Sequence, residues 1–270
     1  MLVKLRNCYP RLHGIQLLPN ESTLASALDT VHNRMVLLKE LSLDSGAHTV
    51  YNHLRCQRLG LPAPTLYHFH NFNDTVVTEC GYAPGKDLFY QLHDSRVDLP
   101  VMSIMKQLLS HVESYQKHNL SHLDIKLENI VWDDQAERLH IIDFEYMRVH
   151  ATAGLVSLET PLGTADYMSP EVLYESKVHR NTDLWNVGLV GYALVMKRIP
   201  LCHGETDRRD LQRYVRRELD DAGVDDALSL LITSLLHFNP EYRSACYVLL
   251  FLFSVTTETL FCNSNMRYLM

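Results

Sequence analysis

The chain has 270 residues, of which 46% are hydrophobic, and a formal net charge of −7 at pH 7. This length is enough for one large domain or two lobes around a substantial core. The negative charge argues against a nucleic-acid partner, because neutralising phosphates requires clustered Lys and Arg. The one basic cluster predicts a solvated helix face, because acids are interleaved with its arginines: Asp207, Arg208, Arg209, Asp210, Arg213, Arg216, Arg217, Glu218 and Asp220.

Cysteine usage and hydropathy indicate the compartment. Cysteines at positions 8, 56, 80, 202, 246 and 262 form no C-x-x-C pair, which predicts reduced thiols in an intracellular protein, cytoplasmic or nuclear, without a zinc site or disulfide scaffold. Residues 1–10 include Lys4 and Arg6 and no small-residue cleavage site, so they do not resemble a secretory signal. The most apolar run, residues 247–255, is far shorter than the roughly 20 residues that cross a bilayer. We interpret it as a buried terminal helix and expect no membrane partner.

The first 80 residues have the pattern of a small sheet with one helix. Short apolar runs at residues 15–18 and 35–38 are separated by polar turns, which predicts two strands. A helix is expected over residues 48–59, and two more strands over residues 66–72 and 75–78. Lys39 directly follows the second apolar run.

The rest of the chain has mostly helical periodicity. Apolar residues at helical spacing predict a long amphipathic helix: Met102, Met105, Leu108, Leu109, Val112 and Tyr115. Residues 130–132 and 139–142 predict a hairpin. Residues 184–195 are apolar almost all round, which is typical of a helix in the middle of a lobe, and Asp183 is a natural N-cap for it.

The loop between the long helix and the hairpin contains the strongest chemical signal. Its sequence, S-H-L-D-I-K-L-E-N over residues 121–129, combines Asp124, Lys126 and Asn129. Such a loop can accept a hydroxyl proton, neutralise a phosphate and bind a metal. The hairpin is expected to present Asn129 and Asp143 at strand ends, where each can supply an oxygen ligand to Mg²⁺.

This loop resembles the catalytic loop of eukaryotic-type Ser/Thr protein kinases, H-R-D-x-K-x-x-N, with Leu123 at the position of the arginine. The sequence I-I-D-F-E at residues 141–145 resembles their D-F-G turn, with Glu145 in place of the glycine. Later segments resemble the end of the activation segment, a helix start and a late arginine of the same family: G-T-A-D-Y-M-S-P-E (163–171), D-L-W-N-V-G (183–188) and N-P-E-Y-R (239–243). The resemblance implies an α+β, bilobal kinase-like fold, with a small sheet lobe over residues 1–80 and a larger helical lobe over residues 81–270.

The resemblance also implies ATP and Mg²⁺ as cofactors and a protein as substrate. Asp124 would orient the substrate hydroxyl and accept its proton, and Lys126 would stabilise the transferring phosphoryl group. Asn129 and Asp143 would hold Mg²⁺. The divergence from the family pattern is similar to that of kinases encoded by large DNA viruses, which would place the protein in a host cell.

Four residues are expected to contact ATP by the same resemblance. Lys39 would pair with the phosphates, and residues 78–80 resemble the gatekeeper and hinge, where Glu79 and Cys80 would use their backbone. Asp87 lies where kinases often place an acid near the ribose.

Two departures from the family pattern concern the nucleotide. No glycine occurs between positions 14 and 46, so the loop that usually covers the ATP phosphates has none. No glutamate occurs between positions 41 and 78, although the family lysine usually pairs with a glutamate on the next helix; Tyr51 and Asn52 lie near the partner's place by spacing. Lys39 is therefore expected to use Asp143, Glu40 or the nucleotide as its counter-ion.

Residues 143–171 would form the activation segment. Leu123 replaces the arginine that usually receives a phosphate on this segment, so we expect the segment to be ordered without phosphorylation of Thr152, Ser157 or Thr160. Thr164 is expected near Asp124 and Lys126, an arrangement typical of Ser/Thr-directed kinases. Glu171 and Arg243 are expected to pair and fasten the segment.

Three functions are compatible with these motifs. The survival of Asp124, Lys126, Asn129 and Asp143 favours an active Ser/Thr protein kinase. The missing glycines, the missing helix glutamate and Glu145 favour the alternative, a pseudokinase that acts as a binding or scaffold module. A small-molecule phosphotransferase of the aminoglycoside or choline type shares H-x-D and a later aspartate, but it lacks counterparts of residues 169–171 and 183–188.

Overall fold

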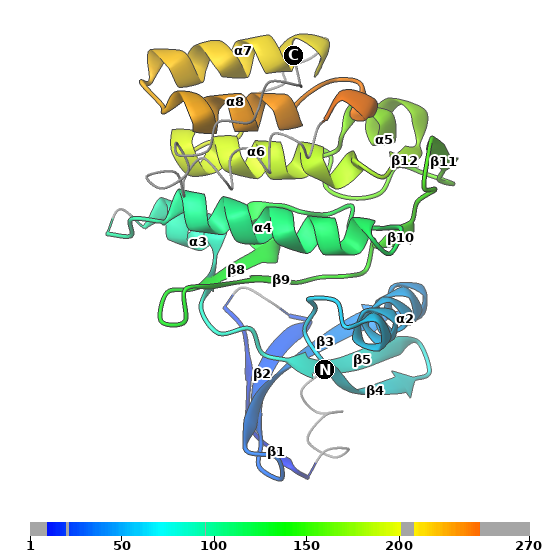
Figure 1. The fold of residues 1–270 in the computed structure, drawn as a ribbon. Helices are drawn as coiled ribbons and strands as arrows, with labels where there is room; N and C mark the ends of the chain where they lie inside the picture. Colours follow the sequence, from blue (N-terminus) through cyan, green and yellow to red (C-terminus); the bar gives the residue numbers. More distant parts are fainter. Residues whose placement is uncertain (1–9, 20–21, 95, 201–207, 244–270) are drawn as a thin grey trace, which may run out of the picture.

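The computed structural model describes residues 10–19, 22–94, 96–200 and 208–243. The N-terminal part is a five-stranded antiparallel sheet in the order β1-β2-β3-β5-β4 (Figure 1). Its strands are β1 (Leu12–Leu17), β2 (Leu24–Asp29), β3 (Arg34–Ser42), β4 (Leu66–Phe72) and β5 (Thr75–Gly81). The sequence did not predict β2, because its alternation rests on the small residues Ala25 and Ala27, both fully buried.

Register assigns the two faces of the sheet. Leu38 pairs with Glu79, and Lys39 pairs with Thr78. Directly opposed residues of an antiparallel pair project to the same side. Leu38 belongs to the small apolar core of the sheet. Lys39 and Thr78 therefore share the opposite face, and Glu79 points toward the side of that small core.

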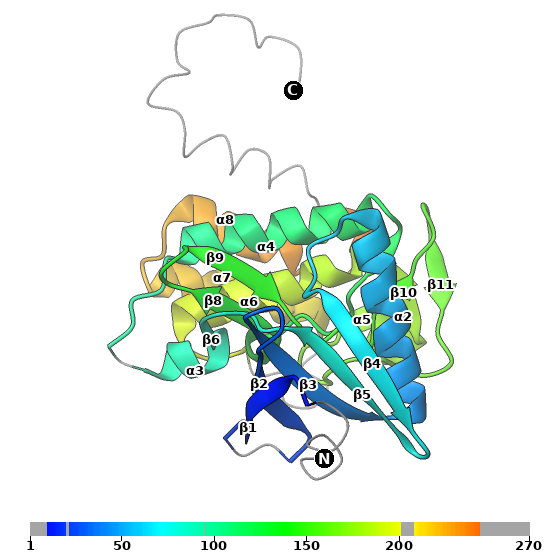
Figure 2. The same cartoon turned by 90° about the horizontal axis from the view of Figure 1, so that it is seen from below.

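Helix α2 (Leu43–Leu59) packs against β5, β3 and β4, and Figures 1 and 2 both show it beside β4 and β5. It starts at Leu43, and not at residue 48 as expected, because the Ser42 side chain accepts a hydrogen bond from the Ser45 amide at 3.3 Å and caps it. Gly46 makes the close approach possible, since a Cβ there would lie 2.5 Å from Cβ of Val76. The sheet and α2 form one unit.

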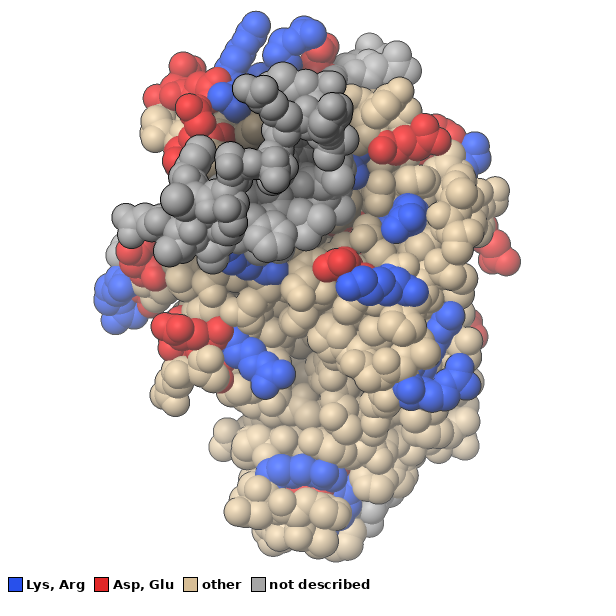
Figure 3. Space-filling view, viewed as in Figure 1, with Lys and Arg blue, Asp and Glu red and all other residues tan. Residues whose placement is uncertain are grey.

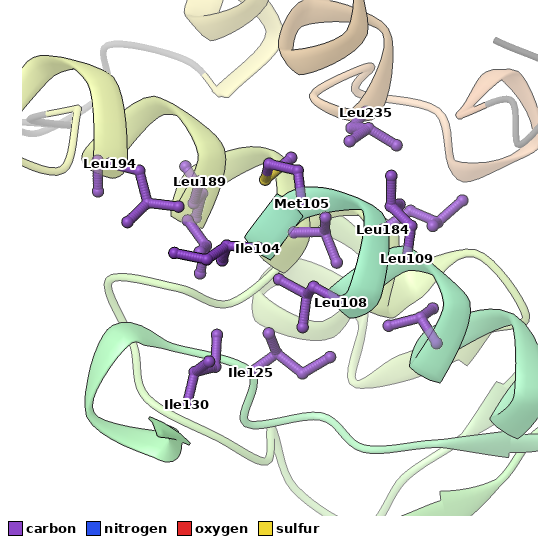
Figure 4. Close-up of a cluster of buried hydrophobic side chains, with 14 of the residues drawn as sticks. Ile104, Met105, Leu108, Leu109, Ile125, Ile130, Leu184, Leu189, Leu194 and Leu235 are labelled. Atoms are coloured by element: carbon purple, nitrogen blue, oxygen red, sulfur yellow. The ribbon is translucent and has the colours of Figure 1, made fainter. Parts of the chain in front are cut away.

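The larger part is mainly helical and confirms the bilobal, α+β fold. Helices α4 (Val101–Gln116), α6 (Thr182–Met196), α7 (Arg208–Asp221) and α8 (Asp226–Leu235) lie in stacked layers (Figure 1). Figure 4 shows side chains of α4, α6 and α8 meeting in the core with Ile125 and Ile130. Residues 183–194 of α6 are all buried, as its uniform apolarity predicts.

Short strands, helices and turns complete the larger part. The hairpin β8 (Ile130–Asp133) and β9 (Arg138–Ile141) is confirmed, and β6 (Lys86–Asp87) pairs with β8. Two small ladders pair β7 (Leu120–Ser121) with β10 (Arg148–Val149), and β11 (Leu155–Ser157) with β12 (Lys177–His179). The remaining elements are α3 (Leu88–His93), α5 (Pro170–Glu175) and the 3₁₀ turns η1 (Leu127–Asn129) and η2 (Pro240–Tyr242).

The expectation that Asp183 caps α6 is wrong. Asn181 occupies the cap position, and Asp183 lies in the first turn, where its carboxylate accepts hydrogen bonds from another segment. The predicted terminal helix over residues 247–255 and residues 1–9 lie outside the described residues.

Two arginines of α7 are paired with acids of the same helix, as expected for a solvated helix face. Arg213 contacts Asp210 at 3.3 Å, and Arg216 contacts Asp220 at 2.9 Å. On the face shown in Figure 3, blue and red side chains lie interspersed over the upper part of the molecule. None of the helices within the described ranges combines the length and the apolarity needed to cross a bilayer.

Buried histidines predict a loss of stability in mild acid. Burial lowers the pKa of His122 to about 4, and burial with the nearby His140 and Arg138 does the same for His111. An unfolded histidine has a pKa of about 6.5, so between these values the unfolded chain binds protons that the native chain does not. We expect the midpoint of thermal unfolding to fall as pH is lowered from 7 to 5. The slope per buried histidine is up to about 1.4 kcal/mol per pH unit.

The variant His111→Leu tests this account. Nδ1 of His111 is buried without a hydrogen-bond partner. The variant therefore removes a titrating group without breaking a hydrogen bond of that atom. Its unfolding midpoint should depend less on pH than that of the wild type. Identical pH dependence in the two proteins would contradict the assignment.

Candidate functional site

The loop at residues 121–129 is anchored by the buried carboxylate of Asp183. The Asp183 oxygens accept the amides of His122 at 2.6 Å and Leu123 at 2.9 Å, and Asp183 is 1% exposed. Leu123, with φ of 68°, is buried, so it continues the core where the family pattern has an arginine. These two hydrogen bonds fix the backbone immediately before Asp124.

Asp124 is oriented through both of its carboxylate oxygens. Oδ1 accepts hydrogen bonds from the Thr164 amide at 2.9 Å and its hydroxyl at 2.8 Å. Oδ2 accepts from Nδ2 of Asn129 at 2.7 Å and lies 3.2 Å from Nζ of Lys126. Lys126 also donates to the Thr164 hydroxyl at 2.7 Å. The predicted neighbourhood of Thr164, Asp124 and Lys126 is therefore present.

Gly163 allows this approach of the activation segment. Its φ is 105°, and a Cβ would lie 2.3 Å from the carbonyl oxygen of Leu123. Only glycine combines this conformation with this contact. The segment consequently passes directly over the loop, which brings Thr164 to Asp124.

Asp143 contacts the sheet lobe through Lys39. Nζ of Lys39 lies 2.8 Å from Oδ1 of Asp143, which is one of the three counter-ions considered from the sequence. Burial raises the pKa of Asp143, but the adjacent Lys39 ammonium, by charge and hydrogen bond, outweighs it and holds this pKa below its ordinary value. Lys39 and Asp143 thus form an ion pair between β3 and the turn after β9.

Phe144 is enclosed by aromatic rings from both lobes. His122 packs edge-on at 4.9 Å between ring centroids, Tyr115 at 6.2 Å, and His53 of α2 at 5.2 Å. Burial keeps the pKa of His53 below its usual value, as for His122. Neutral rings therefore line this cage at neutral pH.

Asn52 of α2 binds the same turn. Its Nδ2 donates to the carbonyl of Phe144 at 2.7 Å and to that of Met147 at 3.2 Å. The sequence placed Asn52 near the family glutamate by spacing only, and gave no sign of these two bonds.

The residues expected at the hinge lie at the end of β5. The Glu79 carboxylate is fully buried and binds Arg11 at 2.5 and 3.0 Å, an ion pair that the sequence did not suggest. Cys80 lies 4.0 Å from Nε2 of His53, and burial raises the pKa of its thiol to about 12. Asp87 caps α3 by accepting the Tyr90 amide at 2.7 Å. Contacts of Glu79, Cys80 and Asp87 with ATP stay predictions.

The donor set suits a magnesium ion bound together with phosphates. Nδ2 of Asn129 donates hydrogen bonds to Asp124. The other amide atom, Oδ1, is the one that could bind a cation. Asp143 uses Oδ1 for Lys39. In the described part of the chain, no three His, Cys or acidic side chains converge as a metal cage of their own. Mg²⁺ usually binds one or two carboxylates and completes its shell with phosphates and water, which fits these residues.

Glu171 and Arg243 pair as expected. The two carboxylate oxygens lie 2.7 Å from the two guanidinium nitrogens, a bidentate geometry, and both side chains are buried. Thr182 donates a further hydrogen bond to Glu171 at 2.8 Å. The pair ties the end of the activation segment to η2.

The model of the protein kinase domain matches residues 64–250, which is more than half of the chain. The chain belongs to the protein kinase domain family. The match begins after Lys39 and α2, so the first three strands and α2, where the glycines and the helix glutamate are missing, are the divergent part of this kinase domain.

Individual relatives agree. The chain is 32% identical over 185 residues to Aurora kinase B of Mus musculus, which covers 66% of this chain and 51% of that protein. It is 30% identical over 149 residues to a probable myosin light chain kinase of Dictyostelium discoideum, covering 52% of this chain and 37% of that protein. Myosin light chain kinase 3 of Homo sapiens is 32% identical over 160 residues, 57% of this chain and 19% of that protein. The chain therefore spans about half or less of the length of these relatives, and it is a divergent, eukaryotic-type kinase domain.

Breaking the buried ion pair should be costly. In Arg243→Leu, Glu171 is left as a buried carboxylate without its guanidinium, and we expect the free energy of unfolding to fall by about 3–5 kcal/mol. Denaturant titration measures this. A matched control is Lys117→Leu, which removes the exposed i,i+4 pair of Lys117 with Glu113 and should change stability by at most about 0.5 kcal/mol. Equal effects of the two variants would contradict a stabilising role for the buried pair.

Proposed function

We propose that this kinase domain transfers the γ-phosphoryl group of ATP to serine or threonine hydroxyls of proteins. The observation that carries the proposal is the double anchoring of Asp124, whose two oxygens are oriented by Thr164 and Asn129. A carboxylate fixed in this way is suited to accept the proton of a substrate hydroxyl. Phosphoryl transfer needs little covalent help from the protein, so positioning and charge account for most of the catalysis.

The two lysines have separate roles in this proposal. Lys126 lies 3.2 Å from Asp124, next to the place of the substrate hydroxyl, and would stabilise negative charge on the transferring group. Lys39 would bind the other phosphates of ATP. Thr164 bridges Asp124 and Lys126, the arrangement associated by resemblance with Ser/Thr substrates.

Asn129 and Asp143 would each supply an oxygen ligand to the metal. Asn129 belongs to η1, and Asp143 follows β9. When bound, Mg²⁺ neutralises the phosphate charge. The ion pair at 2.8 Å would keep the Lys39 ammonium beside Asp143 before nucleotide arrives, where the phosphates bound to the same metal could reach it.

Nucleotide binding and transfer can be tested together. We expect ATP with Mg²⁺ to raise the unfolding midpoint, because a ligand at 100 times its dissociation constant stabilises the native state by about 2.7 kcal/mol. The protein should phosphorylate a generic basic protein on serine or threonine. Asp124→Asn should keep the thermal shift and lose transfer, whereas Lys39→Ala should weaken both. Asp134→Asn, an exposed acid in the β8–β9 turn, is the control and should behave as wild type.

The alternative function makes the opposite prediction. Without glycines in its phosphate loop, a pseudokinase that serves as a binding module would give no thermal shift at millimolar ATP, with or without Mg²⁺, and no transfer. That result would overturn the proposal. Phosphorylation of tyrosine alone would contradict the Ser/Thr assignment.

Activity should not require phosphorylation of the activation segment. Leu123 is buried and cannot bind a phosphate, and the segment is already docked through β11, whose three residues pair with β12. Replacing Thr152, Ser157 and Thr160 together by alanine should leave the transfer rate within about twofold, which is below 0.5 kcal/mol. Phosphatase treatment of the wild type is the matched control. A loss of activity in both experiments would show that a phosphate on this segment is needed.

A further inference from the structure

We propose that Asn52 is a positioning residue that holds helix α2 against the turn carrying Asp143. An amide has this role here, and α2 contains no glutamate. The inference rests on the proposed kinase function for its consequences in catalysis. Its structural part depends only on contacts between α2 and residues 144–147.

The chemistry of one amide group matches the two acceptors. The NH₂ group of Asn52 has two donor hydrogens, and it faces the carbonyls of Phe144 at 2.7 Å and Met147 at 3.2 Å. Asn52 is 4% exposed, so water does not compete freely for these carbonyls. A carboxylate at this position would repel both oxygens. The turn therefore presents two acceptors that match the donors of asparagine and do not match a carboxylate.

Neighbouring positions of α2 contact the same turn. The His53 ring packs on Phe144 at 5.2 Å, and Sγ of Cys56 lies 3.7 Å from Sδ of Met147. Positions 52, 53 and 56 lie on one side of a helix, because residues three or four apart are neighbours on its surface. Asn52 supplies the directional, polar part of this contact.

Lys39 does not link α2 to the site. Its ammonium binds Asp143, and α2 contains no glutamate. The first turn of α2 is fixed on the sheet through Gly46 and Val76, while Asn52 fixes its middle on the turn after β9. Through these two contacts α2 sets the position of the turn relative to β3, from which Lys39 projects.

Loss of the amide should act on steps that need Asp143 in place. Without the donors, two buried carbonyls lose their partners and the turn is no longer held to α2. Asn52 itself touches no substrate. We expect kcat to fall, and Mg²⁺ to increase the affinity for nucleotide by less than it does in the wild type. The affinity for nucleotide without metal and the KM for the protein substrate should stay near their wild-type values.

The test uses the isosteric variant Asn52→Asp, with Asn52→Leu as a second variant of similar size in case the charge prevents folding. The control is Gln212→Glu, which makes the same change of amide to acid where Nε2 of Gln212 donates to the Thr233 carbonyl between α7 and α8. We expect kcat to fall by about tenfold or more in the Asn52 variants, and by less than about twofold in the control, after assays are matched for the folded fraction. The thermal shift with ADP and Mg²⁺ should shrink toward that with ADP alone.

A readout without ligand separates this inference from the proposed function. Amide hydrogen exchange of the unliganded protein should accelerate at residues 144–147 in the Asn52 variants and not in Gln212→Glu. If the wild type neither binds nucleotide nor transfers phosphate, the kinase proposal fails, and hydrogen exchange alone decides the role of Asn52. Unchanged exchange at residues 144–147, or kcat changes equal to those of the control, would overturn the role proposed for Asn52.

Discussion

The arrangement of the candidate site depends on the buried carboxylate of Asp183. It projects from the first turn of α6, the helix buried along nearly its whole length, and accepts the amides of His122 and Leu123. Because α6 is packed in the centre of the helical lobe, its carboxylate is a fixed point for the loop. Asp124 follows that point directly, and Thr164 and Asn129 then determine its orientation. This half of the candidate site thus takes its geometry from the core, without the arginine usual in the loop.

The candidate site meets β3 and α2 at a short segment, residues 143–147. Lys39 of β3 contacts Asp143, and α2 contacts Phe144 and Met147. The family pattern matches the chain only from residue 64 onward, so these contacts with β3 and α2 come from the part of the chain that has diverged most. The segment itself is enclosed on the other side by His122 and Tyr115, which belong to the helical lobe.

Sequence reasoning predicted the helical lobe and the loop well, because their signals are local. Residues 121–129 form a contiguous motif, and α6 is apolar on every side. Strand β2 was missed because alanine and serine give little strand signal. The start of α2 depended on a cap at Ser42 and on a glycine that only a close approach to Val76 explains. The bonds of Asn52 and the pair of Arg11 with Glu79 join residues 92 and 68 positions apart, and no pattern along the chain indicates them.

The pairing of Lys39 with Asp143 explains why a neutral side chain suits α2. The family glutamate on the helix is absent, and Glu145 follows Asp143 two positions later in the sequence. With Lys39 occupied by Asp143, an additional acid on α2 would have no ammonium of its own, and an unpaired charge in a partly buried site is costly. An amide avoids that cost and still donates to two carbonyls. The helix is consequently joined to the turn by hydrogen bonds to backbone carbonyls. These bonds do not require Lys39 as a counter-ion.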